Sequence, residues 1–409
     1  MKRTESSLSA SAALLALGFT LFCAASASAA AAAQPRGDGD TGAPATTQPV
    51  RKRNGTEKQA ENVQRYMARI FDPKKYEHAC NATNPAEFKA WQTSARAALN
   101  ELLRIPTIRA DAGGFQPRAV MQPAIDDLGA FTRQEGRLET EPDVAIHFWI
   151  LQPKGKGPFP VALVSNGHGP SRGAAGIYAS EESKQHTLAE DRDVGVQAAT
   201  RGFIAIVPST RGIGQDPEAF ALLDLDGRNG GKDCVAHNWH AIAAGRTMMG
   251  ERVWDIMKFI DWALALPESD RKTVFMTGNS GGGMLTTYAA AIDERISIAS
   301  PSSSFDDFFA PAGNLTHCQC NHFPGMVRFG QFWDFAGLIA PRPLLTVTGI
   351  KDPAHPVAEI RHAAGEMKRI YTAAGVPDHY EHAFGPAGHR FYKDLMWEFV
   401  SKTLGRDLR

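Results

Sequence analysis

The sequence predicts an α/β fold with a mostly parallel, doubly wound sheet. Short continuous apolar runs such as Val161–Ser165 and Phe203–Val207 are typical of parallel strands that are buried on both faces. Helical patterns lie between successive runs from about residue 119 onward, and this alternation favours parallel strands connected by helices. The 409 residues are 43% hydrophobic and 22% charged, which is ordinary for a globular protein with a substantial core.

The first 29 residues have the pattern of a secretory signal peptide. A basic start (Met-Lys-Arg) is followed by an apolar run from Ala12 to Ala25 and by the small residues Ser26–Ala29. The apolar run is shorter than the ~20 residues that cross a bilayer, and no other segment is apolar enough to do so. We therefore predict cleavage near Ala27 or Ala29 and export to the periplasm or beyond, without a membrane span.

Two further segments precede the alternating region. Residues 30–55 are rich in Ala, Gly, Pro, Thr and Arg and have no periodicity, so we predict a disordered linker. Residues 56–118 are expected to form an N-terminal helical extension. Thr56–Gln59 is typical of a capping box that opens a first helix, and Asn84 followed by Pro85 begins a second one.

Residues 119–409 form the main predicted domain. The longest helical pattern, Gly250–Leu266, carries Val253, Ile256 and Ile260 on one face, as expected of a helix that packs on a sheet. The remaining predicted strands are Val144–Leu151, Val274–Met276, Ile296–Ala299, Leu344–Val347 and Tyr380–Phe384.

A serine turn between a strand and a helix is the most informative motif. The strand pattern at Val274–Met276 runs into Gly278-Asn-Ser280-Gly-Gly282, and a helical pattern follows at Met284–Ile292. In a G-x-S-x-G turn of this kind the serine hydroxyl is exposed at the tip, and the flanking glycines allow a close backbone approach. Ser280 is therefore the predicted nucleophile. The alternative is a glycine-rich turn in which the serine only caps the helix.

A serine hydroxyl is a weak nucleophile, so it needs a base and a third group that orients the base. Asp352 follows a predicted strand, and His389 lies in a glycine loop after the last predicted strand. The order serine, acid, histidine on strand-end loops is typical of such sheets, so we predict Asp352 as the acid and His389 as the base. Asp306 and Asp307 compete for the acid role. In the alternative interpretation Asp352 is a turn residue and His389 a helix cap. His355 is expected at the surface or in a loop.

Acyl transfer also needs N–H donors for the oxyanion of its transition state. The predicted donors are the backbone N–H groups of Gly281, directly after the serine, and of His168, in the loop after an early strand. The side chain of His168 is expected to pack or hydrogen-bond beside the site. The segment 215–244 either overhangs the site or is a plain surface insert. Candidate substrate-lining residues are Asn166, Trp239 and His240.

Four cysteines follow the predicted leader, namely Cys80, Cys234, Cys318 and Cys320. In an exported protein they can form one or two disulfides, and we favour a pair between Cys234 and one of the other two in the C-x-C segment. The residue types of His317–His322 suit zinc, but structural zinc sites prefer wider ligand spacing, so we expect a disulfide or loop packing and no metal. Arg211–Gly214 lacks the full dinucleotide fingerprint, and no cofactor is expected.

The charge composition narrows the classes of partner. The chain has 44 basic and 44 acidic side chains and a formal charge of zero. It therefore offers no basic field for nucleic acid and no acidic tail.

Segments spread over roughly residues 85–395 carry a family resemblance through their combination and order. They are Phe88–Trp91 with Arg96, Gly250–Asp255, Gly278–Gly282, Cys320–Gly325, Ile339–Pro343, Lys351–Pro353 and Gly388–His389. Together they resemble the α/β-hydrolase superfamily, and more narrowly the secreted bacterial esterases of the dienelactone-hydrolase-like or acetyl-xylan-esterase-like kind. The resemblance implies an α/β-hydrolase fold with Ser280 as nucleophile, Asp352 as acid and His389 as base. One departure is Asn166-Gly167, where many relatives have His-Gly, and it concerns loop anchoring more than the backbone donors.

The sequence as a whole predicts an exported serine esterase that works through an acyl-enzyme. Its expected substrate is a small acyl or carbohydrate ester, with acetyl esters of polysaccharide favoured. One alternative is a prolyl-oligopeptidase-like peptidase, but the N-terminal region is too short for the gating domain that such an enzyme normally carries. The other is a noncatalytic hydrolase-fold binding protein, against which the presence of all three triad residues in order argues.

Overall fold

The computed structural model describes residues 57–213, 233–307 and 317–408. The predicted signal peptide, the predicted linker 30–55 and residues 215–232 of the predicted insert lie outside the described residues.

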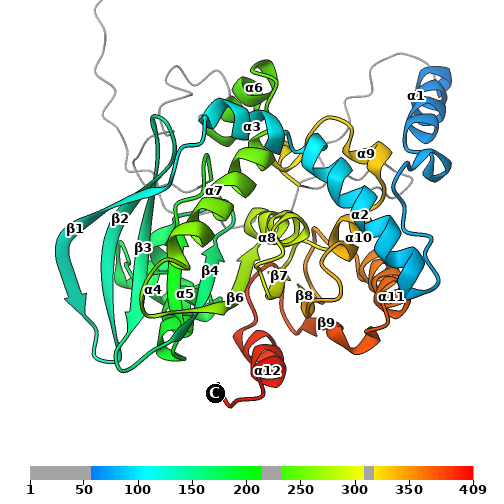
Figure 1. The fold of residues 1–409 in the computed structure, drawn as a ribbon. Coiled ribbons are helices and arrows are strands. Elements are labelled where there is room, and N and C mark those ends of the chain that lie inside the picture. Colours follow the sequence, from blue (N-terminus) through cyan, green and yellow to red (C-terminus); the bar gives the residue numbers. More distant parts are fainter. Residues whose placement is uncertain (1–56, 214–232, 308–316, 409) are drawn as a thin grey trace, which may run out of the picture. The chain divides into compact units, whose positions relative to one another are not determined.

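The described residues form one nine-stranded mixed sheet with helices around it, so the predicted α/β fold class is confirmed (Figure 1). The strand order is β1-β2-β3-β5-β4-β6-β7-β8-β9. Strands β4 to β9 pair in parallel, whereas β1, β2 and β3 pair antiparallel and β3 also runs antiparallel to β5. The strands are β1 (Arg118–Asp127), β2 (Phe131–Glu141), β3 (Val144–Pro153), β4 (Phe159–Ser165), β5 (Ile204–Pro208), β6 (Ser269–Asn279), β7 (Ile298–Ser302), β8 (Leu344–Gly349) and β9 (Tyr380–Gly385).

The helices match most of the helical patterns in the sequence. Met284–Ile292 belongs to α8, and the predicted Gly250–Leu266 overlaps α7. The helices after β4 are α4 (Glu181–Ala189), α5 (Val194–Thr200), α6 (Asp233–Ala243), α7 (Met248–Ala263), α8 (Gly281–Ile292), α9 (Met326–Phe329), α10 (Phe332–Gly337), α11 (Val357–Ala373) and α12 (Lys393–Leu404), with short 3₁₀ turns η2 (Ser171–Gly173), η3 (Gln319–Asn321) and η4 (Pro377–His379).

Alternate residues of the central strands enter two separate hydrophobic clusters, one on each face of the sheet. In β4, Val161 and Leu163 belong to the cluster that includes α7 and α8, and Ala162 and Val164 belong to the cluster that includes α5 and α12. Successive side chains of a strand point to opposite faces, so both faces of the sheet are buried here. This double burial is the physical reason for the continuous apolar runs in the sequence.

From residue 57 onward, three helices precede the sheet: α1 (Glu57–Ile70), α2 (Pro85–Leu102) and α3 (Ile105–Ala112), with the 3₁₀ turn η1 (Pro73–Lys75) after α1. Helix α2 begins where the sequence predicts, because Asn84 Oδ1 accepts the N–H groups of Ala86 at 3.1 Å and Glu87 at 3.0 Å. Its inward residues Phe88 and Leu99 join the same cluster as α7 and α8. Helix α3 has no counterpart among the predicted elements. Arg104, in the left-handed region with a φ of 62°, separates it from α2.

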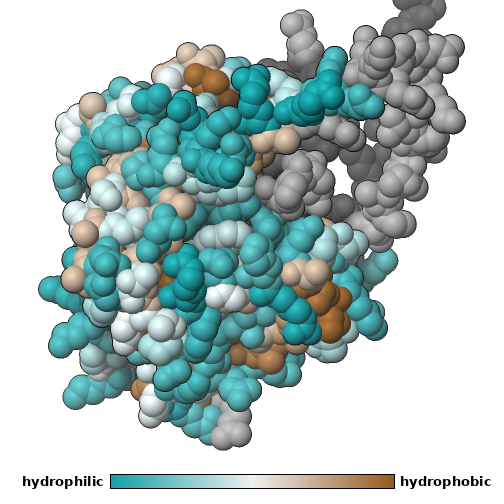
Figure 2. Space-filling view, turned by 90° about the vertical axis from the view of Figure 1, so that its right-hand side faces the viewer, coloured by the Kyte–Doolittle hydropathy of each residue, from teal (hydrophilic) through white to brown (hydrophobic). Residues whose placement is uncertain are grey.

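The described residues show no broad apolar surface on the face that Figure 2 displays. None of the described helices combines the length and the apolar character that crossing a membrane requires. The face shown in Figure 2 is mainly hydrophilic, and its apolar areas are small and separate. On this face the described residues therefore offer no broad apolar surface of the kind that marks a docking site.

Candidate active site

Ser280 lies at a strained turn between β6 and α8. Its φ of 56° and ψ of −120° are unusual for a residue with a side chain, and such strain costs about 1–3 kcal/mol. The flanking glycines are required by close backbone contacts. A Cβ on Gly278 would lie 2.3 Å from the carbonyl oxygen of Gly282, and a Cβ on Gly282 would lie 2.0 Å from that of Ser165. The backbone thus forms the sharp serine turn that the motif indicates, with Ser280 partly exposed between buried neighbours.

Asp352 and His389 contact each other directly. His389 Nδ1 donates to Asp352 Oδ2 at 2.8 Å, and the N–H of Ala354 donates to Asp352 Oδ1 at 3.0 Å. Burial acts to raise the pKa of Asp352, but the hydrogen bond and charge of His389 and the charge of His355 outweigh it and hold that pKa below its ordinary value. The carboxylate is therefore ionised and can fix the imidazole tautomer with Nε2 free to act as a base.

Backbone contacts bring the acid and histidine loops together at the carboxyl ends of β8 and β9. The N–H of Lys351 donates to Ala387 O at 2.9 Å. At the end of β7, Ser302 accepts the N–H of Ser280 at 2.9 Å and donates its hydroxyl to Arg390 O at 3.0 Å, so one strand end contacts both the serine turn and the histidine loop. Within the described residues, the Ser280 hydroxyl makes no hydrogen bond. The hydrogen bond from Ser280 to His389 therefore stays a prediction. Its absence here does not contradict the prediction, because catalytic hydrogen bonds are often long when no substrate is bound.

Of the two places predicted for His355, the surface or a loop, the structure shows the loop. This residue does follow β8 in a loop, but it is 1% exposed and its Nδ1 lies 2.7 Å from Asp306 Oδ2. Burial acts to lower the pKa of His355, yet the hydrogen bond and charge of Asp306 raise it above its ordinary value. The imidazole lies parallel to that of His389, with ring centroids 6.0 Å apart.

The two competitors for the acid role bind other partners. Asp306 contacts His355, while Asp307 accepts from Gln331 at 2.6 Å and contacts His362 at 3.2 Å. Neither contact involves His389, which makes its carboxylate contact with Asp352.

The two predicted oxyanion donors belong to adjacent segments. A Cβ on Gly167 would lie 3.2 Å from Ser280 Cβ, and a Cβ on Gly281 would lie 3.1 Å from the His168 ring, so the loop after β4 touches the serine turn. Within the described residues, the backbone N–H groups of Gly281 and His168 make no hydrogen bond. Two unpaired N–H groups beside a serine are what an oxyanion hole needs, and their role stays a proposal.

The predicted substrate-lining residues occupy two different places. Asn166 lies in the loop beside the serine turn, and its Nδ2 donates to Pro170 O at 2.9 Å. Trp239 and His240 lie on the exposed side of α6, and Trp239 is 56% exposed. The opposite side of α6 buries Cys234 and His237. No described contact joins Trp239 or His240 to the serine turn, so their lining role also stays a prediction.

A buried network of ion pairs lies next to the loop after β4, and it was not predicted from the sequence. Arg211, just after β5, contacts Asp255 at 2.6 Å, Glu141 at 2.7 Å and Glu251 at 3.3 Å. Burial acts to lower the pKa of Arg211, but the carboxylates of Asp255 and Glu251 raise it. The network fixes the start of α7 against the sheet, and no local motif indicates its long-range partners.

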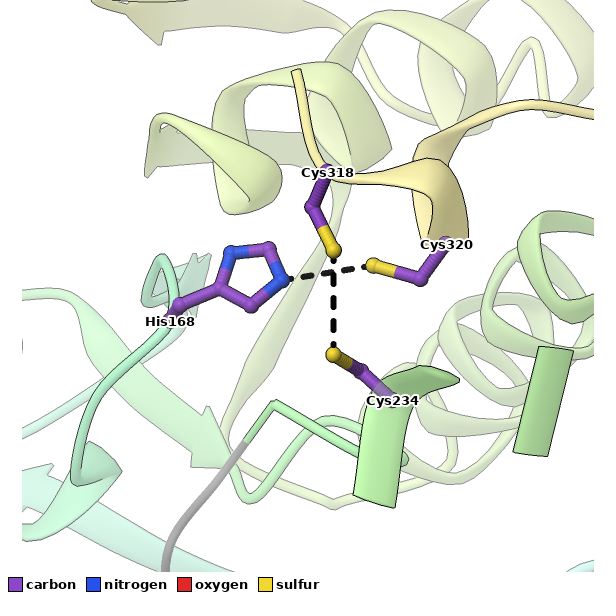
Figure 3. Close-up of side chains that lie close together, drawn as sticks. All are labelled: His168, Cys234, Cys318 and Cys320. Atoms are coloured by element: carbon purple, nitrogen blue, oxygen red, sulfur yellow. Dashed lines mark hydrogen bonds between the residues drawn. The ribbon is translucent and has the colours of Figure 1, made fainter. Parts of the chain in front are cut away.

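The four cysteines of the described residues form no disulfide, so the favoured pair is not present in this structure. Cys234 Sγ lies 3.7 Å from Cys318 Sγ, well beyond the ~2.05 Å of a disulfide bond. The ring of His317 lies beside that of His355, tilted by 42° with centroids 5.1 Å apart, and His322 Nδ1 contacts Cys318 O at 3.1 Å. The imidazole beside the cysteines comes instead from His168, whose Nε2 lies 3.3 Å from Cys320 Sγ (Figure 3).

Comparisons with known proteins agree with this architecture. No family model matches the chain. A Bacillus subtilis protein named "Putative hydrolase YtaP" is 24% identical over 151 residues, which are 36% of this chain and half of that protein. A Bacteroides fragilis structure described as a "putative acetyl xylan esterase" superposes with a TM-score of 0.67 at 16% identity and covers 87% of this chain and 97% of its own. The structure of Methylesterase BT1017 gives a TM-score of 0.60 at 19% identity, over 86% of this chain and 69% of its own. The chain therefore shares the α/β-hydrolase-type fold of these esterases.

Proposed function

We propose that this chain, which shares the α/β-hydrolase-type fold, is an exported serine esterase that cleaves carbohydrate esters. The observation that carries the proposal is the contact between His389 Nδ1 and Asp352 Oδ2 at 2.8 Å, on loops beside a strained Ser280. Such a pair and a serine on a sharp strand-to-helix turn are the parts that acyl transfer requires.

In the proposed mechanism, Ser280 Oγ attacks the ester carbonyl while His389 Nε2 takes the hydroxyl proton. The N–H groups of Gly281 and His168 bind the oxyanion, and the histidine returns the proton to the leaving alcohol. A water molecule then attacks the acyl-enzyme by the same route in reverse. This releases the acid and restores the serine. Asp352 stabilises the imidazolium in both steps.

The proposed substrate class is an acetyl or other small acyl ester of a polysaccharide. One structure with a similar fold is described as a "putative acetyl xylan esterase", which supports ester chemistry on carbohydrate, and a second is named a methylesterase, which supports ester hydrolysis. The predicted signal peptide supports a substrate outside the cytoplasm. The partly buried Asn166, beside the oxyanion loop, and the exposed Trp239 and His240 on α6 are the proposed contacts for the sugar.

A fluorophosphonate probe tests the nucleophile. The purified protein is expected to be labelled at one site, and Ser280→Ala is expected to abolish labelling. Ser94→Ala is the matched control, because Ser94 is an exposed serine on α2 and its loss should leave labelling unchanged. Equal labelling of Ser280→Ala and wild type would reject the serine-hydrolase mechanism.

A substrate panel tests the class of reaction. We expect hydrolysis of short p-nitrophenyl esters and release of acetate from acetylated xylan. Methyl glucuronate esters test whether the enzyme prefers esters in which the sugar supplies the carboxyl group instead of the hydroxyl group. A strong preference for peptide amides over all of these esters would favour the peptidase alternative. Absence of labelling together with no turnover of any of these compounds would favour the binding-protein alternative.

A further inference from the structure

Four soft ligand atoms converge beside the serine turn. They are His168 Nε2 and the sulfurs of Cys234, Cys318 and Cys320, and all of them lie within 4.8 Å of one another. The ligands come from three separate segments: the loop after β4, the first turn of α6 and the loop at η3. Figure 3 shows the four side chains pointing toward one centre from different sides. Cys234 and Cys320 are buried, and the other two are partly buried.

The separations fit one tetrahedral zinc ion. Zinc–sulfur bonds of about 2.3 Å and zinc–nitrogen bonds of about 2.0–2.1 Å place two sulfurs about 3.8 Å apart, and a sulfur and a nitrogen about 3.6 Å apart. The observed separations are 3.7 Å between Cys234 Sγ and Cys318 Sγ and 3.3 Å between His168 Nε2 and Cys320 Sγ. A disulfide needs about 2.05 Å and would leave the third sulfur and the imidazole without a partner.

Arg252 gives a second, independent indication of an anionic centre. Its side chain is fully buried in α7, and its Nη1 lies 3.5 Å from Cys320 Sγ and 3.3 Å from Asn321 Oδ1. Within the described residues, its guanidinium has no carboxylate partner. A buried cation without a counter-ion is very costly. Three thiolates and one neutral imidazole around Zn²⁺ carry a net charge of −1, which the Arg252 guanidinium neutralises.

We propose that His168 Nε2, Cys234, Cys318 and Cys320 bind one zinc ion in a closed structural site. Binding releases the three thiol protons to solvent and leaves the imidazole neutral, with no change of oxidation state. Four protein ligands leave no open position, so the ion holds the three segments together and does not activate water. This site replaces the disulfide that the sequence suggests, and it takes neither His317 nor His322.

The zinc ion also supports the proposed esterase site, and this part rests on the proposed function. His168 provides a ligand through its ring and a candidate oxyanion donor through its backbone N–H. Its ring packs against Gly281, which carries the second candidate donor. Asn321, next to the ligand Cys320, places its Nδ2 3.7 Å from where a Cβ of Gly281 would be. Loss of zinc should therefore loosen the oxyanion hole while the Asp352–His389 pair stays in place.

Metal analysis of the untagged protein, purified from an exporting host without chelators, tests the site. We expect about one zinc per chain, and alkylation mapping by mass spectrometry should find all three ligand cysteines reduced. Cys234→Ser and Cys318→Ser should each weaken zinc binding at least tenfold. Cys80→Ala is the matched control, because Cys80 is also a buried thiol but lies outside the cluster, and it should keep its zinc. Absence of zinc, or a disulfide from Cys234 to either other cysteine, would overturn the proposal whether or not the variants fold.

Kinetics separate the zinc site from the esterase proposal. Ser280→Ala is expected to lose activity and to retain zinc. Removal of zinc from the wild type is expected to lower kcat on a p-nitrophenyl ester at least tenfold with little change in KM, and added zinc should restore it. An unchanged kcat in zinc-free protein would overturn the supporting role in the oxyanion hole. An inactive wild type that contains zinc would count against the esterase function alone.

Discussion

The sharpest test of the proposed mechanism compares two buried carboxylates, the predicted acid Asp352 and its competitor Asp306. Asp352 accepts the His389 Nδ1–H at 2.8 Å, and Asp306 contacts His355 at 2.7 Å. In Asp352→Asn, the amide presents either a donor to His389 or an acceptor that cannot balance the imidazolium charge. A wrong tautomer places the proton on Nε2, where it cannot accept from the serine. We expect kcat/KM to fall about 10³–10⁴-fold, which is a loss of about 4–5.5 kcal/mol of transition-state stabilisation.

Asp306→Asn is the matched control, because it has the same chemistry in an equally buried place. It removes the counter-charge of His355, so we expect a loss of about 1–3 kcal/mol in the free energy of unfolding. Its kcat/KM should stay within tenfold of wild type, because His355 only stacks on His389 and does not replace its acid. Both variants are compared by hydrolysis of a p-nitrophenyl ester after urea denaturation has shown that each is folded.

The reversed result would refute the assignment. If Asp306→Asn lost more activity than Asp352→Asn in folded protein, Asp306 would be the functional acid and the observed His389 contact would be incidental. A fall of less than tenfold in Asp352→Asn would also contradict the orienting role.

Three further predictions concern the structure around the site. Gly282→Ala should lower the free energy of unfolding by about 3 kcal/mol or more in urea denaturation, because the new Cβ would lie 2.0 Å from Ser165 O. Gly365→Ala in α11 is the control, because its Cβ meets nothing within 4 Å, and it should raise the free energy of unfolding by about 0.5–1 kcal/mol. Equal effects of the two changes would contradict the tight turn. Arg211→Met should cost about 3–5 kcal/mol by calorimetry, because it takes the guanidinium from the buried Asp255 and leaves the buried Glu141 and Glu251 with Arg246 as their remaining arginine partner. A neutral change would show that these acids are satisfied in another way. Burial and the charge of Arg361 lower the pKa of His382 to about 4. Between pH 6.5 and about pH 4, His382 is therefore protonated in the unfolded chain and neutral in the folded chain. Stability should therefore fall as the pH decreases through that window, by at most about 1.4 kcal/mol per pH unit, and His382→Gln should flatten the slope in urea denaturation at several pH values. If the free energy of unfolding of His382→Gln depended on pH as steeply as that of the wild type, other groups would cause the pH dependence.

The sequence predicts the central strands well because their physical signal is local. A strand buried on both faces must be apolar along its whole length, as Val161–Leu163 shows, and a serine turn needs glycine at Gly278 and Gly282 whatever surrounds it. The outer strand β1 gives a weaker signal, because most of its side chains are exposed and β2 is its one neighbour among the strands that the structure describes. Helix α3 was missed because it follows α2 almost directly, after the single left-handed residue Arg104.

The contacts between distant residues could not be predicted in the same way. The choice between Asp306 and Asp352 depends on which loop meets His389, and His355 is buried only because Asp306 supplies its charge partner. The segment His317–His322 contains zinc-type residues, but the structure completes the cluster with His168 and Cys234 from other parts of the chain. The spacing of ligand-type residues along the chain therefore argues against a metal site, whereas their positions in the folded structure favour one.

The buried Arg252 sets a condition on any attempt to engineer a metal-free version of this protein. Exchanging the three cysteines for apolar residues would remove the thiol groups but leave a fully buried guanidinium facing a neutral pocket. A successful redesign would have to replace Arg252 by a neutral side chain of similar volume in the same step. It would also need a new donor for Asn321 Oδ1, which accepts from Arg252, and an apolar partner for the ring of His168. The cluster and the start of α7 are thus one unit of design, and they have to be changed together.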